Sequence, residues 1–525
     1  IRDRINVYMT FEIVFVLLSL LGMMAALIAD KMRPGMVLFS VVVLFLCVGI
    51  LTPKEMLEGF SNKGMITVAL LFLVSEGIRQ SGTLGQVIKK LLPQGKTTVF
   101  KAQLRILPSV AFISAFLNNT PVVVIFAPII KHWAKSVKLP ATKFLIPLSY
   151  VTILGGICTL IGTSTNLVVH GMILEAGYEG FTMFELGKVG IFIAIAGIIY
   201  LFIFSKRLLP DARPDTAVPD EEVEEGEKLH RVEAVLGARF PGINKKLSDF
   251  NFQRHYGAEV KEIKTRNGQR YVDHLEDVVL REGDTLVVMA DDTFIPTWGE
   301  SSVFVLLTNG NDPDTSGKKK RWLALILLVL MIVGATVGEL PATKEMFPDI
   351  KLDMFFFVCI TTIIMAWTNI FPARKYTKYI SWDILITIAC AFAISKAMVN
   401  SGVADCVAGF IIGLSDDYGP HVLLAILFVI TNLFTELITD NAAAALAFPL
   451  ALSISAQLGV SPTPFFVVIC MAASASFSTP IGYQTNLIVQ GIGNYKFTDF
   501  VRIGLPLNII TFLISVILIP LIWNF

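Results

Sequence analysis

The sequence predicts an all-α polytopic membrane protein, built as an inverted repeat with a small α/β domain inserted between its halves. Of the 525 residues, 54% are hydrophobic and only 16% are charged, whereas a typical soluble domain carries about 25% charged residues. Apolar runs of about 20 residues, the length that crosses a bilayer as a helix, recur along the chain. A polar motif also occurs twice, at a constant separation.

The first half, residues 1–210, contains five apolar runs that predict membrane spans. A sixth run, 102–135, has the polar centre Asn118–Pro121, which predicts a re-entrant hairpin that enters and leaves on one side. One of the five runs is too long for a single straight helix and is interrupted at Gly155-Gly156 and again at Gly162–Asn166. The predicted spans are 11–29, 34–51, 62–80, the broken span 143–176, and 185–208.

The second half, residues 319–525, repeats this series of elements. A hairpin is predicted at 421–457 around Thr439–Asn441, and a break is predicted at Pro480–Asn486. The predicted spans are 321–340, 352–370, 381–400, the broken span 463–493, and 500–523.

The two halves also share sequence. The segment CTLIGTSTNLVVHG at 158–171 matches STPIGYQTNLIVQG at 478–491 in 8 of 14 positions, at an offset of 320, and Ser81-Gly82 meets Ser401-Gly402 at the same offset. Each half crosses the membrane five times, so the second copy is inserted upside down. Inverted repeats with broken helices near the midplane are typical of secondary transporters.

The charges of the connecting loops predict the orientation. With the N-terminus outside, the cytoplasmic loops contain 24 Lys and Arg residues and the opposite loops contain 8. Positive residues favour the cytoplasmic side. We therefore expect a multi-pass protein of the plasma membrane (the bacterial inner membrane), with both termini outside.

Residues 211–318 differ from the rest of the chain. They begin with an acidic run at 220–227, and short strands are predicted at 232–236, 258–264 and 285–290, with a hairpin turn at Asn267-Gly268. These features predict a small cytoplasmic α/β domain behind an acidic linker. Neither a GxGxxG motif nor a Walker motif occurs in the chain, which argues against an ATP-driven pump.

The two hairpin tips and the two broken spans supply four polar breaks, which we expect to converge. Non-helical backbone at membrane depth is tolerated where it lines a cavity or is buried in protein. Its freed carbonyls can ligate a cation such as Na+, and the half-helix N-termini favour an anion. One half-site is predicted from Asn118, Asn119, Thr120, Gly162, Ser164, Thr165 and Asn166, and its mirror from Asp440, Asn441, Ser478, Thr479, Gly482, Gln484, Thr485 and Asn486.

A single Asn, Ser or Thr in a span more often joins two helices than binds a ligand. Four breaks in two related pairs favour a binding site instead. Asp440 is the sharpest candidate, because an intramembrane carboxylate is expensive and usually functional. Glu436 lies one turn before Asp440 on the same helix face, and structural pairing with a neighbouring group is the alternative interpretation for both carboxylates. Glu76 and Lys396 are interpreted as packing or interdomain contacts.

The hairpin FLNNTPVVVIFAPII, the break IGTSTN, the hairpin TELITDNAAAALAFP and the break PIGYQTN resemble the divalent anion/sodium symporter (DASS) family, within the ion transporter superfamily. The insert resembles the TrkA-C domain of sulfate-permease-like members. The resemblance implies a homodimer with elevator motion, two Na+ sites, an anion between the tips, and a possible small-molecule regulator of the insert. The implied anion ligands are Asn119, Thr120, Ser164, Thr165, Asn441, Gln484 and Thr485, and the implied cation ligands are Asn118, Asn119, Gly162, Asn166, Asp440, Asn441, Gly482 and Asn486.

The second tip departs from the family's Ser-Asn-Thr pattern, since Ala442 offers no hydroxyl to a substrate carboxylate. We therefore expect Na+-coupled symport of sulfate or a similar divalent anion. The alternatives are an Na+/dicarboxylate symporter, a cation/proton antiporter or arsenite carrier, for which Asp440 is the reason, and a channel regulated by the insert. No nucleophile–base arrangement stands out, so we do not expect an enzyme.

Overall fold

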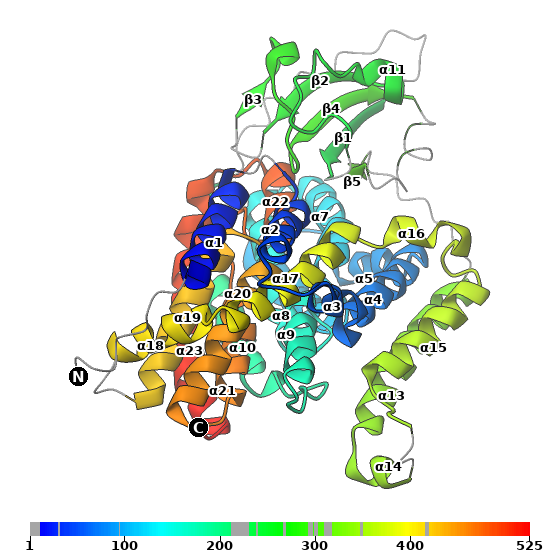
Figure 1. The fold of residues 1–525 in the computed structure, drawn as a ribbon. Coiled ribbons are helices and arrows are strands. Elements are labelled where there is room, and N and C mark those ends of the chain that lie inside the picture. Colours follow the sequence, from blue (N-terminus) through cyan, green and yellow to red (C-terminus); the bar gives the residue numbers. More distant parts are fainter. Residues whose placement is uncertain are drawn as a thin grey trace, which may run out of the picture.

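The computed structural model describes residues 11–29, 32–93, 95–211, 230–237, 240–265, 269–291, 294, 298, 303–308, 318–346, 350–414 and 419–525. Figure 1 shows a body of helices with a small β-sheet at one end. The predicted acidic run 220–227 and the predicted turn at Asn267-Gly268 lie outside the described residues.

A helix lies at every apolar run predicted in the first half. Pro34 and Pro53 start α2 and α3, where their missing N–H costs nothing, and the Asn62 side chain caps α4 by accepting from Gly64 N. The helices are α1 (Phe11–Ala29), α2 (Pro34–Val48), α3 (Pro53–Glu58), α4 (Lys63–Gln80), α5 (Thr83–Leu91), α6 (Val99–Ser114), α7 (Asn119–Ser136), α8 (Leu145–Gly156), α9 (Ser164–Glu175) and α10 (Gly187–Leu208).

A helix likewise lies at every apolar run predicted in the second half. The short helices α5 and α18, which the sequence did not predict, follow Gly82 and Gly402, whose φ values of 70° and 76° suit glycine. The helices are α13 (Lys318–Gly338), α14 (Pro341–Met346), α15 (Met354–Trp367), α16 (Tyr376–Tyr379), α17 (Trp382–Asn400), α18 (Val403–Leu414), α19 (Gly419–Leu437), α20 (Asp440–Leu458), α21 (Thr463–Ser474), α22 (Gln484–Gly493) and α23 (Phe497–Ile522).

Among the described residues, eight helices are long and apolar enough to cross a membrane: 11–29, 53–80, 187–208, 319–338, 382–400, 419–437, 440–458 and 497–522. The runs that contain α2 and α15 form shorter helices than predicted, and each arm of the second hairpin is long enough to span by itself. Helix α23 exposes Leu505, Ile509, Leu513 and Ile517 at four-residue spacing. Such an apolar stripe on the outer surface suits contact with lipid.

Both predicted hairpins and both predicted broken spans consist of two helices joined by non-helical chain. The first hairpin is α6 and α7, and its broken span is α8 and α9 with a break at 157–163. The second hairpin is α19 and α20, and its broken span is α21 and α22 with a break at 475–483. Helices α7, α9, α20 and α22 begin at or next to the predicted polar motifs, so their N-termini coincide with the candidate site.

In the described part of the insert, five strands form one antiparallel sheet in the order β3-β2-β4-β1-β5. Its core is built from alternating side chains such as Val232, Leu286 and Val288, packed on a group of aromatic rings around Phe240. The strands are β1 (His230–Leu236), β2 (Glu259–Lys264), β3 (Arg270–Tyr271), β4 (Thr285–Ala290) and β5 (Phe304–Thr308), with the short helix α11 (Phe252–Tyr256) beside them.

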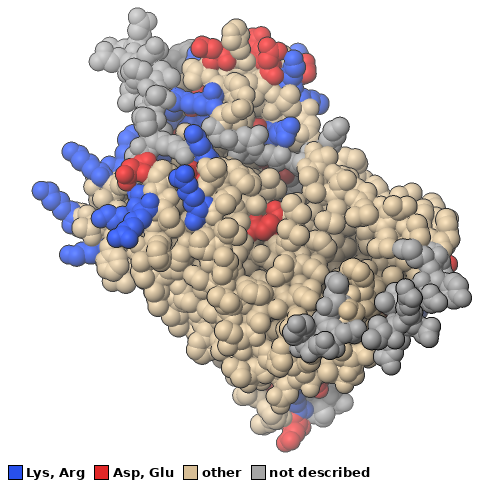
Figure 2. Space-filling model, turned by 90° about the vertical axis from the view of Figure 1, so that its left-hand side faces the viewer, with Lys and Arg blue, Asp and Glu red and all other residues tan. Residues whose placement is uncertain are grey.

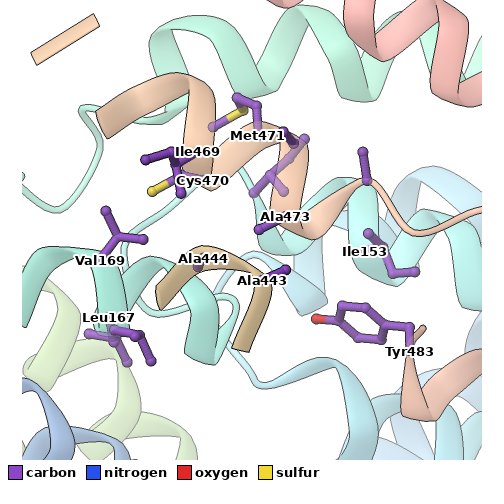
Figure 3. Close-up of a cluster of buried hydrophobic side chains, with 14 of the residues drawn as sticks. Ile153, Leu167, Val169, Ala443, Ala444, Ile469, Cys470, Met471, Ala473 and Tyr483 are labelled. Carbon is purple, nitrogen blue, oxygen red and sulfur yellow. The ribbon is translucent and has the colours of Figure 1, made fainter. Parts of the chain in front are cut away.

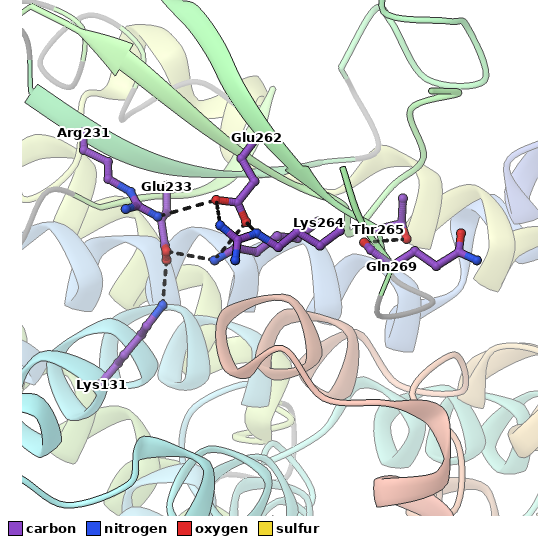
Figure 4. Close-up of polar contacts among 8 residues, drawn as sticks. Lys131, Arg231, Glu233, Glu262, Lys264, Thr265 and Gln269 are labelled. Atoms are coloured by element: carbon purple, nitrogen blue, oxygen red, sulfur yellow. Dashed lines mark hydrogen bonds and ion pairs between the residues drawn. The ribbon is translucent and has the colours of Figure 1, made fainter. Parts of the chain in front are cut away.

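The sheet is docked on α7 through a partly buried ion network (Figure 4). Lys131 Nζ of α7 lies 2.9 Å from Glu233 Oε2 of β1, and Lys264 Nζ of β2 lies 3.4 Å from Glu233 Oε1. Burial alone would raise the pKa of Glu233, but the two lysines lower it to about 2. The sheet also contacts α22, where a Cβ on Gly491 would lie 2.6 Å from Thr285 Oγ1.

The start of α20 lies within the main apolar core, which extends through the helical body. Figure 3 shows Ala443 and Ala444 of α20 next to side chains of α9 and α21, among them Val169 and Met471. Small alanine side chains let these helices approach closely. The polar tip of the second hairpin therefore lies beside buried apolar side chains.

Candidate functional site

The two breaks are braced by the same hydrogen bonds at an offset of 320 residues. Asn166 Nδ2 donates to Gly156 O at 3.4 Å and to Thr159 O at 2.9 Å. Asn486 Nδ2 donates to Ser476 O at 2.8 Å and to Thr479 O at 3.2 Å. These asparagines satisfy carbonyls that the broken helices leave without partners.

The hydroxyls of the breaks repeat this pattern. Thr159 Oγ1 accepts from Gly162 N at 3.2 Å and donates to Ala115 O, next to the first tip. Thr479 Oγ1 accepts from Gly482 N at 3.3 Å and donates to Glu436 O at 3.1 Å, near the second tip. The paired motifs in the sequence thus correspond to paired structures.

Glycine is required at the centre of each break because other backbone atoms lie against it. A Cβ on Gly162 would lie 2.5 Å from Gly156 O, and a Cβ on Gly482 would lie 2.3 Å from Thr435 O. Real Cβ atoms do not approach that closely. These positions can contribute to a ligand site only through their backbone.

The tip of the first hairpin contacts the break of the second half. Asn119 Nδ2 donates to Tyr483 OH at 2.6 Å, and Thr120 Oγ1 donates to Gln484 Oε1 at 3.3 Å. Asn119 is buried, whereas Gln484 is exposed. Residues 364 positions apart are brought together at the start of α7 and α22.

The tip of the second hairpin contacts the break of the first half. Ser164 Oγ donates to Asn441 Oδ1 at 3.2 Å, and Thr165 Oγ1 donates to Asp440 Oδ2 at 2.8 Å. Thr163 Oγ1 lies 2.9 Å from Tyr483 OH, which links the two breaks directly. The four polar segments therefore meet in one region of the interior.

Asn118 lies at the side of this region. It lines a small cavity together with Ser164 and apolar side chains of α4 and α13, among them Val68 and Leu328. The cavity lies between the first tip and the helices α4 and α13. Asn118 is therefore beside the cluster, and its side chain makes no cap hydrogen bond to α7.

Thr485 and Asn486 face a different partner from the one expected. Ser149 Oγ of α8 lies 2.8 Å from Thr485 Oγ1 and 2.7 Å from Asn486 Oδ1. Both residues are fully buried. These hydrogen bonds join α22 to α8.

Unpartnered oxygens indicate where a cation fits. Asn166 Oδ1 and Thr439 Oγ1 are buried and have no hydrogen-bond partner among the described residues. A buried oxygen without a donor is costly, and such oxygens suit Na+. The oxygens of the first break thus fit the predicted cation. At the second break, Asn486 Oδ1 accepts from Ser149 Oγ, while Glu436 Oε2 and Asn508 Oδ1 are buried without partners among the described residues.

Glu436 is held by neutral donors through one oxygen only, and its Oε2 is buried without a hydrogen-bond partner among the described residues. Its Oε1 accepts from Ser478 N at 2.8 Å and from Asn508 Nδ2 at 2.7 Å, and Asn508 Nδ2 also donates to Ser478 Oγ at 2.9 Å. The carboxylate thereby ties α19 and α23 to the second break.

Sequence reasoning missed Tyr483, Ser149 and Asn508. Tyr483 lies inside the repeated motif, where the first half has Thr163, so that mismatch was a signal. Ser149 and Asn508 lie in apolar helices outside the motifs. Only the tertiary structure brings them to the site.

Comparison with known proteins assigns the chain to a family. The model of the citrate transporter family, CitMHS, matches residues 24–454 and, in a second match, residues 346–525. The chain belongs to this family. Family membership and the eight apolar helices make it a multi-pass membrane protein of the transporter class.

The chain is also similar to individual proteins, two of which are named as transporters. An uncharacterized transporter of Synechocystis is 29% identical over 92% of this chain and 93% of its own length. A putative sulfur deprivation response regulator of Chlamydomonas reinhardtii is 28% identical over 91% of this chain and 96% of its own length. A probable sodium/sulfate cotransporter of the same alga is 32% identical over 53% of this chain and 31% of its own length.

Proposed function

We propose that this chain is a secondary active transporter that couples Na+ to the import of sulfate or a similar divalent anion. One observation carries the proposal: each hairpin tip is hydrogen-bonded to the break of the opposite half, through Thr120–Gln484 and Thr165–Asp440. Polar backbone and side chains thus converge in a helical interior. The relative named as a sodium/sulfate cotransporter supports both the ion and the anion.

The anion site is proposed between the tips. Its donors are hydroxyls, amides and half-helix N-termini, because the tips and breaks contain no Lys or Arg. Ala442 lies at the second tip and provides no hydroxyl, which favours a compact oxyanion. The proposed anion ligands are Asn119, Thr120, Ser164, Thr165, Asn441, Gln484 and Thr485.

Two Na+ sites are proposed, each between a hairpin tip and the break of the same half. The unpartnered Oδ1 of Asn166 supports the first site, and the carboxylate of Asp440 supports the second, since Na+ prefers oxygen ligands. The proposed ligands are Asn118, Asn119, Gly162 and Asn166 for the first ion and Asp440, Asn441, Gly482 and Asn486 for the second.

The proposed mechanism is elevator motion of the hairpins and broken spans in a homodimer, with the repeats inverted. Matching hydrogen bonds in the two breaks support the duplication. Both termini are proposed outside, with the insert cytoplasmic. In support, Figure 2 shows a broad area without charge on the drawn face of the helical body, and Lys and Arg side chains gathered at the end next to the sheet.

Uptake of labelled sulfate into proteoliposomes tests the proposal. We expect accumulation that requires an inward Na+ gradient and stops when choline replaces Na+. Sulfate uptake that is indifferent to this replacement would refute sodium coupling. Citrate is the second candidate, because the matching family is described as a citrate transporter, and competition by unlabelled citrate or succinate distinguishes the two.

A further inference from the structure

Tyr483 occupies the point where the two hairpin tips and the first break approach one another. It comes from the chain just before α22, and it is 7% exposed. Its hydroxyl lies 2.6 Å from Asn119 Nδ2 and 2.9 Å from Thr163 Oγ1. Figure 3 shows the ring beside Ile153, with its hydroxyl end extending toward Ala443.

The repeat shows that this tyrosine is an addition to one half only. At the offset of 320 residues, the position of Tyr483 corresponds to Thr163, although the surrounding residues Gly482, Thr485 and Asn486 are matched by identical ones. The first half thus has a small hydroxyl side chain where the second half has a large aromatic one. The matching hydrogen bonds of Asn166 and Asn486 form beside either side chain. The structure of the break therefore does not require the aromatic ring of Tyr483.

Tyr483 also determines the orientation of the side-chain amide of Asn119. Asn119 Oδ1 accepts from Ser114 Oγ at 2.7 Å, while its Nδ2 donates to Tyr483 OH. The amide is therefore held from both ends in one orientation. The second hydrogen of Nδ2 has no acceptor within the described residues and remains able to bind an anion.

We propose that Tyr483 is the specificity-determining residue of the anion site, restricting it to compact tetrahedral oxyanions such as sulfate. This inference rests on the proposed function and deepens it. The hydroxyl orients the Asn119 amide toward the anion, and the ring fills the space that a four-carbon dicarboxylate needs between the tips. A close-packed interior cannot expand around the longer anion without a cost.

Two substitutions separate the hydroxyl from the ring. Tyr483→Phe keeps the ring and removes the hydroxyl, so we expect the KM for sulfate to rise about threefold to tenfold, the effect of one neutral hydrogen bond. Its ratio of sulfate to succinate uptake stays that of the wild type. Tyr483→Thr copies the residue of the mirror position, and we expect that ratio to fall at least about tenfold, the scale of a lost packing constraint.

Proteoliposome uptake of labelled sulfate and labelled succinate, at saturating Na+, measures both effects. Tyr178→Thr is the matched control, because it makes the same change at a tyrosine that is 46% exposed. If Tyr483→Thr does not fold, Tyr483→Leu shortens the side chain while keeping it apolar. A folded Thr or Leu variant with the wild-type ratio would overturn the inference.

The outcome also separates this inference from the proposed function. A wild-type protein that transports neither sulfate nor succinate with Na+ contradicts the proposed function. A wild-type protein that transports sulfate, combined with variants of unchanged selectivity, contradicts the role of Tyr483 alone. A Tyr483→Phe variant whose KM for sulfate is unchanged would overturn the role of the hydroxyl.

Discussion

Asp440 is the residue on which cation coupling depends most directly in the proposed mechanism. Its Oδ2 accepts from Thr165 Oγ1 and its Oδ1 accepts from Asn441 N, both at 2.8 Å. It lies in the first turn of α20, where the helix N-terminus favours negative charge. The carboxylate is thus held in one orientation at the junction of the second tip and the first break.

Asp440→Asn should preserve the shape of the tip and remove its charge. We expect the Na+ concentration for half-maximal sulfate uptake to rise about tenfold, or about 1.4 kcal/mol, with expression little changed. Asp405→Asn is the control, because Asp405 on α18 accepts from Ser453, away from the tips. A superimposable Na+ activation curve for Asp440→Asn would remove this residue from the cation site.

Gly482 provides a second prediction at the residue scale. A Cβ there would lie 2.1 Å from Ser476 Oγ and 2.3 Å from Thr435 O, and overpacking of this kind costs about 1–3 kcal/mol. We expect Gly482→Ala to lower the thermal midpoint of the detergent-solubilised protein. A Cβ on Gly413, within α18, would meet no atom within 4 Å, so Gly413→Ala should not lower the midpoint. Equal midpoints for the two variants would contradict the packing argument.

At the scale of elements, the broken spans depend on one asparagine each. Asn166 and Asn486 make matching pairs of bonds to carbonyls of their own breaks. They differ in the remaining oxygen, since Ser149 donates to Asn486 Oδ1 whereas Asn166 Oδ1 has no donor among the described residues. The two breaks are thus stabilised by equivalent hydrogen bonds, but of these two asparagines only Asn166 has an amide oxygen without a donor that could bind a cation.

Alanine at either position should therefore destabilise the protein by a similar amount, about 1–3 kcal/mol, because buried carbonyls lose their donors. The dependence on Na+ should separate the two variants. We expect Asn166→Ala to raise the Na+ concentration for half-maximal uptake more than Asn486→Ala does. The opposite order in parallel uptake assays would place the stronger cation ligand in the second break.

At the scale of the whole molecule, the insert is attached to parts of the proposed transport machinery. Its sheet contacts α7 through Lys131 and Glu233 and contacts α22 at Gly491. Both helices begin at the candidate site. Any movement of the first hairpin or the second broken span must therefore move the sheet or break this contact.

The ion network predicts how docking responds to pH. The folded-state pKa of Glu233 is lowered from the ordinary 4.5 to about 2, so its contribution is complete above about pH 5 and is lost as pH falls through about 2. We expect hydrogen–deuterium exchange in 230–236 to be unchanged between about pH 8 and about pH 5, after correction for the intrinsic exchange rate.

Glu233→Gln should increase that exchange at neutral pH, because it removes the charge that both lysines share. Glu259→Gln is the matched control, since Glu259 pairs with Lys261 at an exposed position where an ion pair contributes little. Equal protection of 230–236 in the two variants would show that the network does not hold the sheet in place.

Local pattern determined much of this protein. The apolar runs, the interrupted spans and the polar tips follow from composition and periodicity, because a helix in lipid must satisfy its own backbone. Alternating residues likewise predicted the strands β1, β2 and β4. The repeated motif was enough to identify Asn166 and Asn486 as equivalent positions, since they fall at the same place in the two copies.

The partners of these residues depend on tertiary structure. The offset of 320 relates Thr163 to Tyr483. It does not predict that the hydroxyl of Tyr483 binds the side chain of Asn119. The contacts of Ser149, Asn508 and Glu233 likewise cannot be predicted from local sequence. Periodicity describes each helix by itself, whereas side-chain contacts depend on how helices pack across hundreds of residues. The sequence by itself therefore determined where the polar breaks lie, and only the folded chain decided which breaks meet.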